Sequence, residues 1–231
     1  MQIWVTAPTA MEMKPLISWL ESGSQQTGQQ KYRFRGHDIV IKVTGIGAVA
    51  TVFHLTRELE KDKPDWILQL GLAGSYHAEL APGSVVVVER ERLADLGAED
   101  RDRFVDIFSL GLESPDVFPF EQGWLVNPYL KKFRNLTIPA VQGITVQTVS
   151  GSAATIARRA ALYQPQIETM EGAAFHYVCL HMQVPFLQLR AISNYVEPRD
   201  KSKWKITEAL ASLHQTLQQW LLAWPEELQM L

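Results

Sequence analysis

Short apolar runs alternate with amphipathic helical patterns along most of this chain, and no other feature limits the possible fold as strongly. The predicted strands span 1–7, 38–47, 64–74, 83–93 and 185–193, and the predicted helices span 12–23, 48–62, 169–182 and 206–224. The run at 64–74 is largely apolar, which is typical of a strand covered on both faces. The alternation therefore predicts an α/β fold in which helices cover both faces of a mostly parallel sheet.

The composition is that of one globular domain. The chain has 231 residues, and its hydrophobic content of 46% is enough for a continuous core. No break in composition divides it, so residues 1–231 are treated as a single domain. The segment 95–128 mixes charges, prolines and aromatics, and we expect it to be an ordered insertion or lid rather than a linker.

The charge balance limits the possible partners. A formal net charge of −3 provides no field for holding nucleic acid or an anionic membrane, so neither is an expected partner. The single cysteine, Cys179, cannot form an internal disulfide, and we see no charged leader or apolar run of membrane-spanning length. We therefore expect a cytoplasmic protein that binds a small molecule at a local site.

Ligands of open α/β sheets bind at the carboxyl ends of the strands, so the residues that follow each strand are the first candidates. Glu12 follows the first strand, the turns 45–47 and 71–74 follow the next two, and Asn194 ends the late strand. Glu171 joins them if its helix starts at the same edge. Each also has an ordinary explanation, because glutamates favour helix starts and glycine or asparagine favours turns.

The common cofactor and metal motifs are incomplete. The glycines at 45–47 lack the third glycine and the acidic partner of a dinucleotide fingerprint, and no lysine follows them as in a P-loop. His176 and His181 are five residues apart, which does not place them on one helical face as zinc motifs require. Ser75 and Ser150 lie outside a G-x-S-x-G elbow. We therefore expect no metal and no cofactor.

The order Glu12, "TGIGAVA", "LGLAGS", "TMEGAA" and "RAISNYVE" resembles the nucleoside phosphorylase and nucleosidase family, which includes 5′-methylthioadenosine/S-adenosylhomocysteine nucleosidase. The resemblance spans most of the chain, and its most specific part is "ME-x-AA" followed about twenty residues later by "RAIS". It implies a single-domain, three-layer α/β/α sandwich around a mixed, mostly parallel sheet. It also implies assembly as a homodimer or larger homo-oligomer.

The resemblance assigns roles to individual residues. Glu12 matches a base that activates water, Glu171 a carboxylate that binds both ribose hydroxyls, and Met170 a residue beneath the sugar. Trp204 matches an aromatic residue that closes over the ligand. The remaining substrate-binding positions implied are Gly47, Ala73, Gly74 and Ser193.

These roles suit cleavage of an N-glycosidic bond. The reaction passes through an oxocarbenium-like sugar, which calls for negative charge near the sugar, an activated water and relief of charge on the leaving purine. Phosphorylases of the family carry arginines near the glycine turns to bind phosphate, but "TGIGAVATV" and "GLAGSYHAELAPGSVVVV" contain none. Water is therefore the expected nucleophile.

Asn194 departs from the adenine-specific nucleosidases, which carry "RAISD". An amide cannot supply a proton, but its NH₂ can donate to N7 and O6 of a 6-oxopurine, which favours hypoxanthine over adenine. Asn194 and the segments "NYVEPRDKSKW" and "SLGL…FPF…G-x-L-x-NP" together resemble the futalosine hydrolase branch of the family. Enzymes of this branch release hypoxanthine from futalosine on the way to menaquinone. Asn194 is then the catalytic residue that recognises the purine. Arg101 or Arg103 would meet the carboxylate end of the substrate.

Two alternatives remain open. The first is another enzyme of the same family, either a methylthioadenosine/S-adenosylhomocysteine-type nucleosidase or a purine nucleoside phosphorylase. The second is a non-catalytic nucleoside-binding protein, which would bind purine nucleosides without releasing the base. The presence of both Glu12 and Glu171 argues against the second.

Overall fold

Strands and helices alternate through the structure, a computed structural model that describes residues 1–133 and 138–224. The helices are α1 (Ala10–Gly23), α2 (Gly47–Leu59), α3 (Ala153–Tyr163), α4 (Gly172–Met182) and α5 (Ile206–Leu222), with 3-10 turns η1 (Leu130–Lys132) and η2 (Lys201–Lys203). The strands are β1 (Gln2–Ala7), β2 (Gln25–Gly28), β3 (Lys31–Phe34), β4 (His37–Val43), β5 (Trp66–Ser75), β6 (Val85–Leu93), β7 (Gly97–Asp100), β8 (Arg103–Asp106), β9 (Leu125–Val126), β10 (Ala140–Thr145), β11 (Ile167–Thr169) and β12 (Phe186–Tyr195).

The main sheet has the order β11-β10-β6-β12-β5-β1-β4-β3-β2, and β9 pairs with β6. β1 is parallel to β4 and β5, and β12 is parallel to β5. β6 is antiparallel to β12 but parallel to β10. Because β11 pairs with both β10 and β5, the strands β5, β12, β6, β10 and β11 close into a ring. The predicted mixed sheet is confirmed, and the half formed by β5, β12, β6, β10 and β11 is closed like a barrel.

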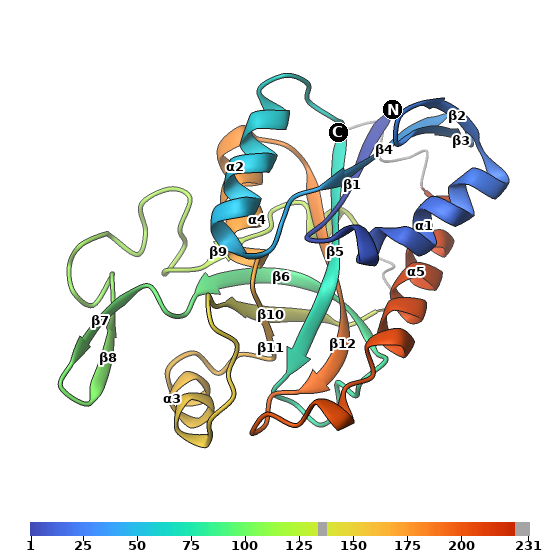
Figure 1. Cartoon of the computed structure of the whole chain (residues 1–231). Coiled ribbons are helices and arrows are strands. Elements are labelled where there is room, and N and C mark those ends of the chain that lie inside the picture. The colour runs from blue at the N-terminus through green and yellow to red at the C-terminus, as the bar shows by residue number, and fades with distance from the viewer. Residues whose placement is uncertain (134–137, 225–231) are drawn as a thin grey trace.

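The alternating side chains of β1 explain why helices lie on both faces of the sheet. Ile3 and Val5 are fully buried in a cluster that includes Leu16 of α1. Trp4, between them, points to the other face and packs in a cluster with Leu55 of α2. Figure 1 accordingly shows α1 and α5 on one side of the sheet and α2 and α4 on the other. The predicted three-layer arrangement is therefore confirmed.

The segment 95–128 contains regular structure. β7 and β8 form a separate two-stranded hairpin, which projects from the body at the left of Figure 1. Farther along, β9 returns the chain to the main sheet beside β6, where Leu125 is fully buried. The role of this segment as a lid stays a prediction.

Some boundaries differ from the sequence prediction. The strand predicted at 38–47 ends at Val43, because Gly45 and Gly47 each adopt φ 83° and turn the chain into α2. The helix predicted from 169 begins at Gly172, since residues 167–169 pair in the sheet as β11. The sequence patterns also missed the β2–β3 hairpin, β10 and α3.

Candidate active site

Glu12 lies in the first turn of α1, just after the carboxyl end of β1. Thr9 is the N-cap residue: the Glu12 backbone nitrogen donates to Thr9 Oγ1 at 3.3 Å, and the Thr9 backbone nitrogen donates to Glu12 Oε2 at 3.0 Å. The Thr9 hydroxyl donates to the same carboxylate oxygen at 2.6 Å. Burial raises the pKa of Glu12, although Thr9 and Arg190 oppose the rise. A carboxyl group in this setting is well placed to act as a base near neutral pH.

Glu171 is the N-cap residue of α4 and is only 6% exposed. Its side chain does not cap its own helix. Instead, Oε1 accepts a hydrogen bond from the backbone nitrogen of Gly47 at 2.9 Å. Gly47 is buried at the start of α2 with positive φ, a conformation that glycine adopts readily. The structure thus brings Glu171 and the predicted glycine turn into contact.

Arg190 of β12 is fully buried, lies near Glu171 and is close enough to Glu12 to oppose the rise in its pKa. Its Nη2 donates to Gln69 Oε1 at 2.8 Å, and its Nη1 lies 3.7 Å from Glu171 Oε2. Gly71 of β5 makes room for the guanidinium, because a Cβ there would overlap Nη1 and lie 3.6 Å from Glu12 Oε1. Among the described residues, Nη1 has no hydrogen-bond partner. The two carboxylates and this unused donor therefore border one small buried region.

This arrangement can bind and activate a water molecule. The Arg190 guanidinium can donate to the water oxygen, while the Glu12 carboxylate accepts one of its protons. The positive charge of Arg190 also makes burial of a carboxylate less costly, since buried charges need a partner. A ligand with hydroxyl groups would find a second acceptor in Glu171.

Asn194 and Ser193 lie at the carboxyl end of β12, beside Ala73 and Gly74 of β5. The register between the two strands shifts at Ser193, and such a bulge redirects side chains locally. The Ser193 hydroxyl donates to Asn194 Oδ1 at 2.7 Å. A Cβ at Gly74 would lie 3.4 Å from Asn194 Nδ2. These four predicted positions are therefore adjacent, and they follow Arg190 along the same pair of strands.

Trp204 and Met170 are both half-buried. The backbone nitrogen of Lys205 donates to the carbonyl of Ser193 at 2.8 Å, so the segment that carries Trp204 lies against the end of β12. The Arg199 guanidinium lies over the Trp204 ring, 5.1 Å from its centroid. The structure thus places Trp204 near the predicted base-recognition residues.

Arg101 and Arg103 lie in the projecting β7–β8 hairpin. Arg101 is in its turn with φ 56°, and the Arg103 side chain is 82% exposed, 4.0 Å from Asp100. In Figure 1 this hairpin extends outward from the main sheet. Within one chain, the described structure shows no interaction of these arginines with Glu12 or Glu171.

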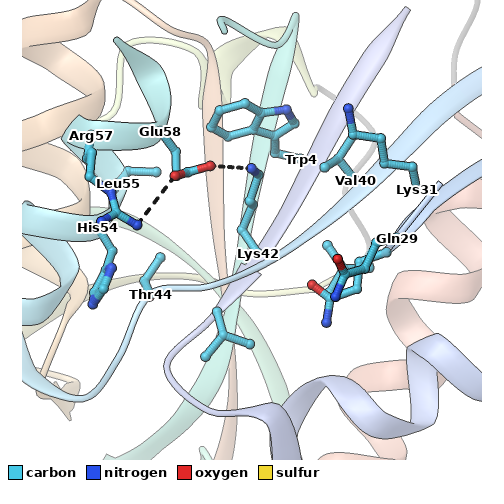
Figure 2. A pocket seen from close by; sticks show the side chains of 13 residues that line it. Trp4, Gln29, Lys31, Val40, Lys42, Thr44, His54, Leu55, Arg57 and Glu58 are labelled. Atoms are coloured by element: carbon cyan, nitrogen blue, oxygen red, sulfur yellow. Dashed lines mark hydrogen bonds and ion pairs between the residues drawn. The ribbon is translucent and has the colours of Figure 1, made fainter. Parts of the chain in front are cut away.

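A separate hollow of about 400 Å³ lies between α2, β4 and the β2–β3 turn (Figure 2). Its charges are paired internally: Lys42 Nζ donates to Glu58 Oε2 at 2.5 Å, and Arg57 lies 3.7 Å from Glu58 Oε1. Hydrogen bonds from Lys42 and Lys61 lower the pKa of Glu58 to about 2. The candidate catalytic side chains do not line this hollow. We therefore place the candidate site at the sheet edge described above.

Within residues 1–133 and 138–224, no group of three or more His, Cys, Asp and Glu side chains could hold a metal ion. Over the same ranges, no helix is long and apolar enough to cross a membrane. His176 is fully buried against the carbonyl of Leu125 at 2.9 Å, and burial lowers its pKa to about 4. His176 therefore packs as a neutral side chain.

The sequence patterns did not single out Arg190, which stands within the largely apolar run "PFLQLRAIS". A usable signal was present, because the same "LQL" pattern occurs in "DWILQLGLAG". Gln69 and Gln188 from these two runs pair in register across β5 and β12, and both are fully buried. Matching glutamines in two buried strands indicate a polar layer inside the sheet, where a buried arginine can find partners.

The chain is similar to several known proteins. The model of the phosphorylase superfamily matches residues 3–223. Futalosine hydrolase of Thermus thermophilus is 33% identical over 185 residues, which cover 78% of this chain and 79% of that protein. The 5′-methylthioadenosine/S-adenosylhomocysteine nucleosidase of Bacillus thuringiensis subsp. konkukian is 27% identical over 231 residues, covering 94% and 95%. The S-adenosylhomocysteine nucleosidase of Streptococcus pyogenes, solved with 5-methylthiotubericidin, shares the fold with a TM-score of 0.77 at 21% identity, covering 97% of this chain and 98% of that one.

Proposed function

The chain belongs to the phosphorylase superfamily, and from this membership we propose that it is a nucleosidase that hydrolyses the N-glycosidic bond of futalosine and releases hypoxanthine. The observation that carries the proposal is the buried arrangement of Glu12 and Glu171 around Arg190. It combines a base, an acceptor for sugar hydroxyls and an unused donor. These groups supply the activated water and the negative charge near the sugar that hydrolysis of a nucleoside requires.

The nucleophile in this mechanism is a water molecule between Glu12 and Arg190. Glu12 accepts a proton from the water as its oxygen attacks the anomeric carbon, and Nη1 of Arg190 holds the oxygen in place. The electron pair of the broken C–N bond leaves with hypoxanthine, which takes a proton from the solvent. Both groups are buried, so their interactions with the water are stronger than they would be in bulk solvent. The raised pKa of Glu12 makes its carboxylate a better proton acceptor than an exposed glutamate.

Glu171 binds the ribose. A carboxylate can accept hydrogen bonds from two neighbouring hydroxyls at once, and it stabilises the positive charge that develops on the sugar. Gly47 holds one carboxylate oxygen through its backbone nitrogen, and Arg190 lies near the other. The carboxylate is therefore already oriented before the substrate arrives.

The position of Asn194 supports hypoxanthine as the leaving base. Its side chain is partly exposed at the end of β12, next to Ser193 and Gly74. The amide Nδ2 donates to the carbonyl of Tyr195 at 2.8 Å, which leaves its second N–H for N7 or O6 of a 6-oxopurine. An aspartate at this position could supply a proton to N7 and accept from a 6-amino group, which suits adenine. The 33% sequence identity to futalosine hydrolase also supports hypoxanthine as the leaving base. The 5′-methylthioadenosine/S-adenosylhomocysteine nucleosidase is less similar but matches over more of the chain.

We also propose that the chain functions as a homo-oligomer. Large apolar side chains are exposed at the start of α1 and along the first half of α2: Met11 59%, Ile46 63%, Val49 80% and Phe53 58%. Such a group of exposed apolar side chains is typical of an interface. Sedimentation equilibrium should give a multiple of 26.1 kDa, and a monomer at micromolar concentration would contradict the proposal.

Release of the base by the purified protein tests the function. Futalosine, its 6-amino analogue, methylthioadenosine and inosine would each be incubated without phosphate, and the bases would be separated by chromatography. We expect hypoxanthine from futalosine as the main product. Release of adenine, chiefly from methylthioadenosine, would assign the chain to the methylthioadenosine/S-adenosylhomocysteine-type nucleosidases. Binding without release from any of the four would support a nucleoside-binding protein.

A further inference from the structure

The N-terminus of α4 is capped in an unusual way. Glu171 occupies the N-cap position but makes no side-chain hydrogen bond to its own helix, because its carboxylate points to Gly47 and Arg190. The first backbone N–H groups of a helix have no partner within the helix, and they usually bind the N-cap side chain. In this buried helix other groups must replace Glu171 in that role.

Two threonines from neighbouring strands provide the replacement. The backbone nitrogen of Gly172 donates to Thr169 Oγ1 at 3.2 Å, and that of Ala173 donates to Thr145 Oγ1 at 2.7 Å. Thr145 ends β10 and Thr169 ends β11, and both are buried. The last residues of β10 and β11 therefore cap α4, the helix that begins directly after Glu171.

Glu91 completes this network. Each threonine hydroxyl accepts from a helix N–H, so its single hydrogen must go to another acceptor. Glu91 of β6 provides both acceptors: Thr145 Oγ1 donates to Oε2 at 3.0 Å, and Thr169 Oγ1 donates to Oε1 at 3.3 Å. A Cβ at Gly172 would overlap the Glu91 carboxylate, so the helix start fits closely around it.

We propose that Thr145, Thr169 and Glu91 are positioning residues, which cap α4 in place of Glu171 and so leave the Glu171 carboxylate free for ribose. This inference rests on the proposed nucleosidase function. The three residues are buried behind the helix start, and they act by fixing where α4 begins. Since Glu171 is the residue just before that point, the cap also fixes the position of its side chain.

The network can form in either protonation state of Glu91. Burial raises the pKa of Glu91 to about 7, although Gln188, which donates at 2.9 Å, and the charge of Arg190 oppose the rise. His176, the nearby titratable group on α4, stays neutral because burial lowers its pKa to about 4. When protonated, Glu91 can donate to Thr145, whose hydroxyl can then donate to Thr169 Oγ1 at 3.1 Å. Both threonines still accept from the helix, so the cap depends on hydrogen bonding and not on charge.

The test replaces the hydroxyls while keeping the side-chain shape. Thr145→Val and Thr169→Val should each raise KM for the nucleoside roughly tenfold, with a smaller change in kcat, because the hydrogen bond to the helix is lost and Glu171 shifts. Thr145→Ser should keep KM near that of the wild type. Thr51→Val is the matched control, because Thr51 is fully buried and its hydroxyl has no hydrogen-bond partner among the described residues. Glu91→Gln should recover most of the activity lost in Glu91→Leu, since it can sustain the network.

A double-mutant cycle shows whether the effect passes through Glu171. If it does, Thr145→Val should lower kcat/KM by less than about twofold in a Glu171→Gln background, because the affected contact is already lost. An undiminished loss in that background, or valine variants with the KM of the wild type, would overturn the inference.

Hydrogen exchange separates this inference from the proposed function. Exchange of the Gly172 and Ala173 amides should be faster in both valine variants and unchanged in Thr51→Val. If the wild-type protein released no base from any nucleoside, the proposed function would fail, while faster exchange would still support the cap. Unchanged exchange would overturn the cap whatever the activity. If Thr145→Val failed to fold, Thr169→Val would carry the same comparison.

Discussion

Replacing Gly71 with alanine should displace Arg190 without removing any polar group from the candidate site. A Cβ at Gly71 would overlap Nη1 of Arg190 and lie 3.0 Å from its Cζ, whereas ordinary contacts begin at 3.4 Å. Arg190 is fully buried and bound to Gln69, so it cannot move into solvent. The guanidinium must therefore retreat by roughly 1 Å, and a misplacement of this size near reacting groups costs about 10²-fold in rate.

The same overlap should also lower stability. Overpacking a buried site costs about 1–3 kcal/mol, which for a protein of this size lowers Tm by roughly 2–12 °C. The measurements are kcat/KM for base release without phosphate and Tm by calorimetry. Gly23→Ala is the matched control, since a Cβ at Gly23, at the end of α1, would meet nothing within 4 Å. A Gly71→Ala protein with the Tm of the wild type and kcat/KM within threefold of it would refute this reasoning about Arg190.

Glu12→Gln should lower kcat by about 10²-fold or more with a modest change in KM, because it removes the base but little of the substrate binding; steady-state kinetics check this, and an unchanged kcat would reject the role. Because burial raises the pKa of Glu12, kcat/KM of the wild type should fall as the pH drops through that raised pKa, and a pH profile of Glu12→Gln should lack this step. Asn194→Asp should shift preference towards 6-aminopurines, measured as the ratio of kcat/KM for the 6-amino analogue and futalosine; an unchanged ratio would exclude Asn194 from recognition of the base. Glu91 has a pKa raised from 4.5 to about 7, so the folded state binds more protons than the unfolded state between these values. The free energy of unfolding should therefore decrease as pH rises from 4.5 to 7, on the order of 3 kcal/mol in total. Urea titrations should show a smaller decrease for Glu91→Gln, and equal slopes for the two proteins would contradict the raised pKa.

The sequence predicted the layers of the fold because strand and helix periodicities are local properties. Trp4, which lies between Ile3 and Val5 in β1, shows the alternation that places helices on both faces. The closure of the sheet could not be predicted in this way, because β11 has only three residues and its pairing with β5 joins Ile167 to Ser75. A contact between segments so distant in sequence leaves no periodic signal in either one.

Some residues of the candidate site could also be predicted from local sequence signals, and others could not. Glu12 and Glu171 could be proposed because they follow strand ends or begin helices, and the family resemblance gave them roles. Arg190, Glu91 and Thr145 lie inside or at the ends of strands, where polar residues have no local explanation. Their importance comes from buried contacts between strands, which only the three-dimensional structure reveals.

Hydrolysis in ¹⁸O-labelled water tests the central claim most directly. The purified protein would be incubated with futalosine in phosphate-free buffer, and the sugar product would be analysed by mass spectrometry. The mechanism predicts release of hypoxanthine and incorporation of one ¹⁸O at the anomeric carbon, because Glu12 and Arg190 deliver water to that carbon. Release of base only after phosphate is added, with a sugar phosphate as the product, would contradict it.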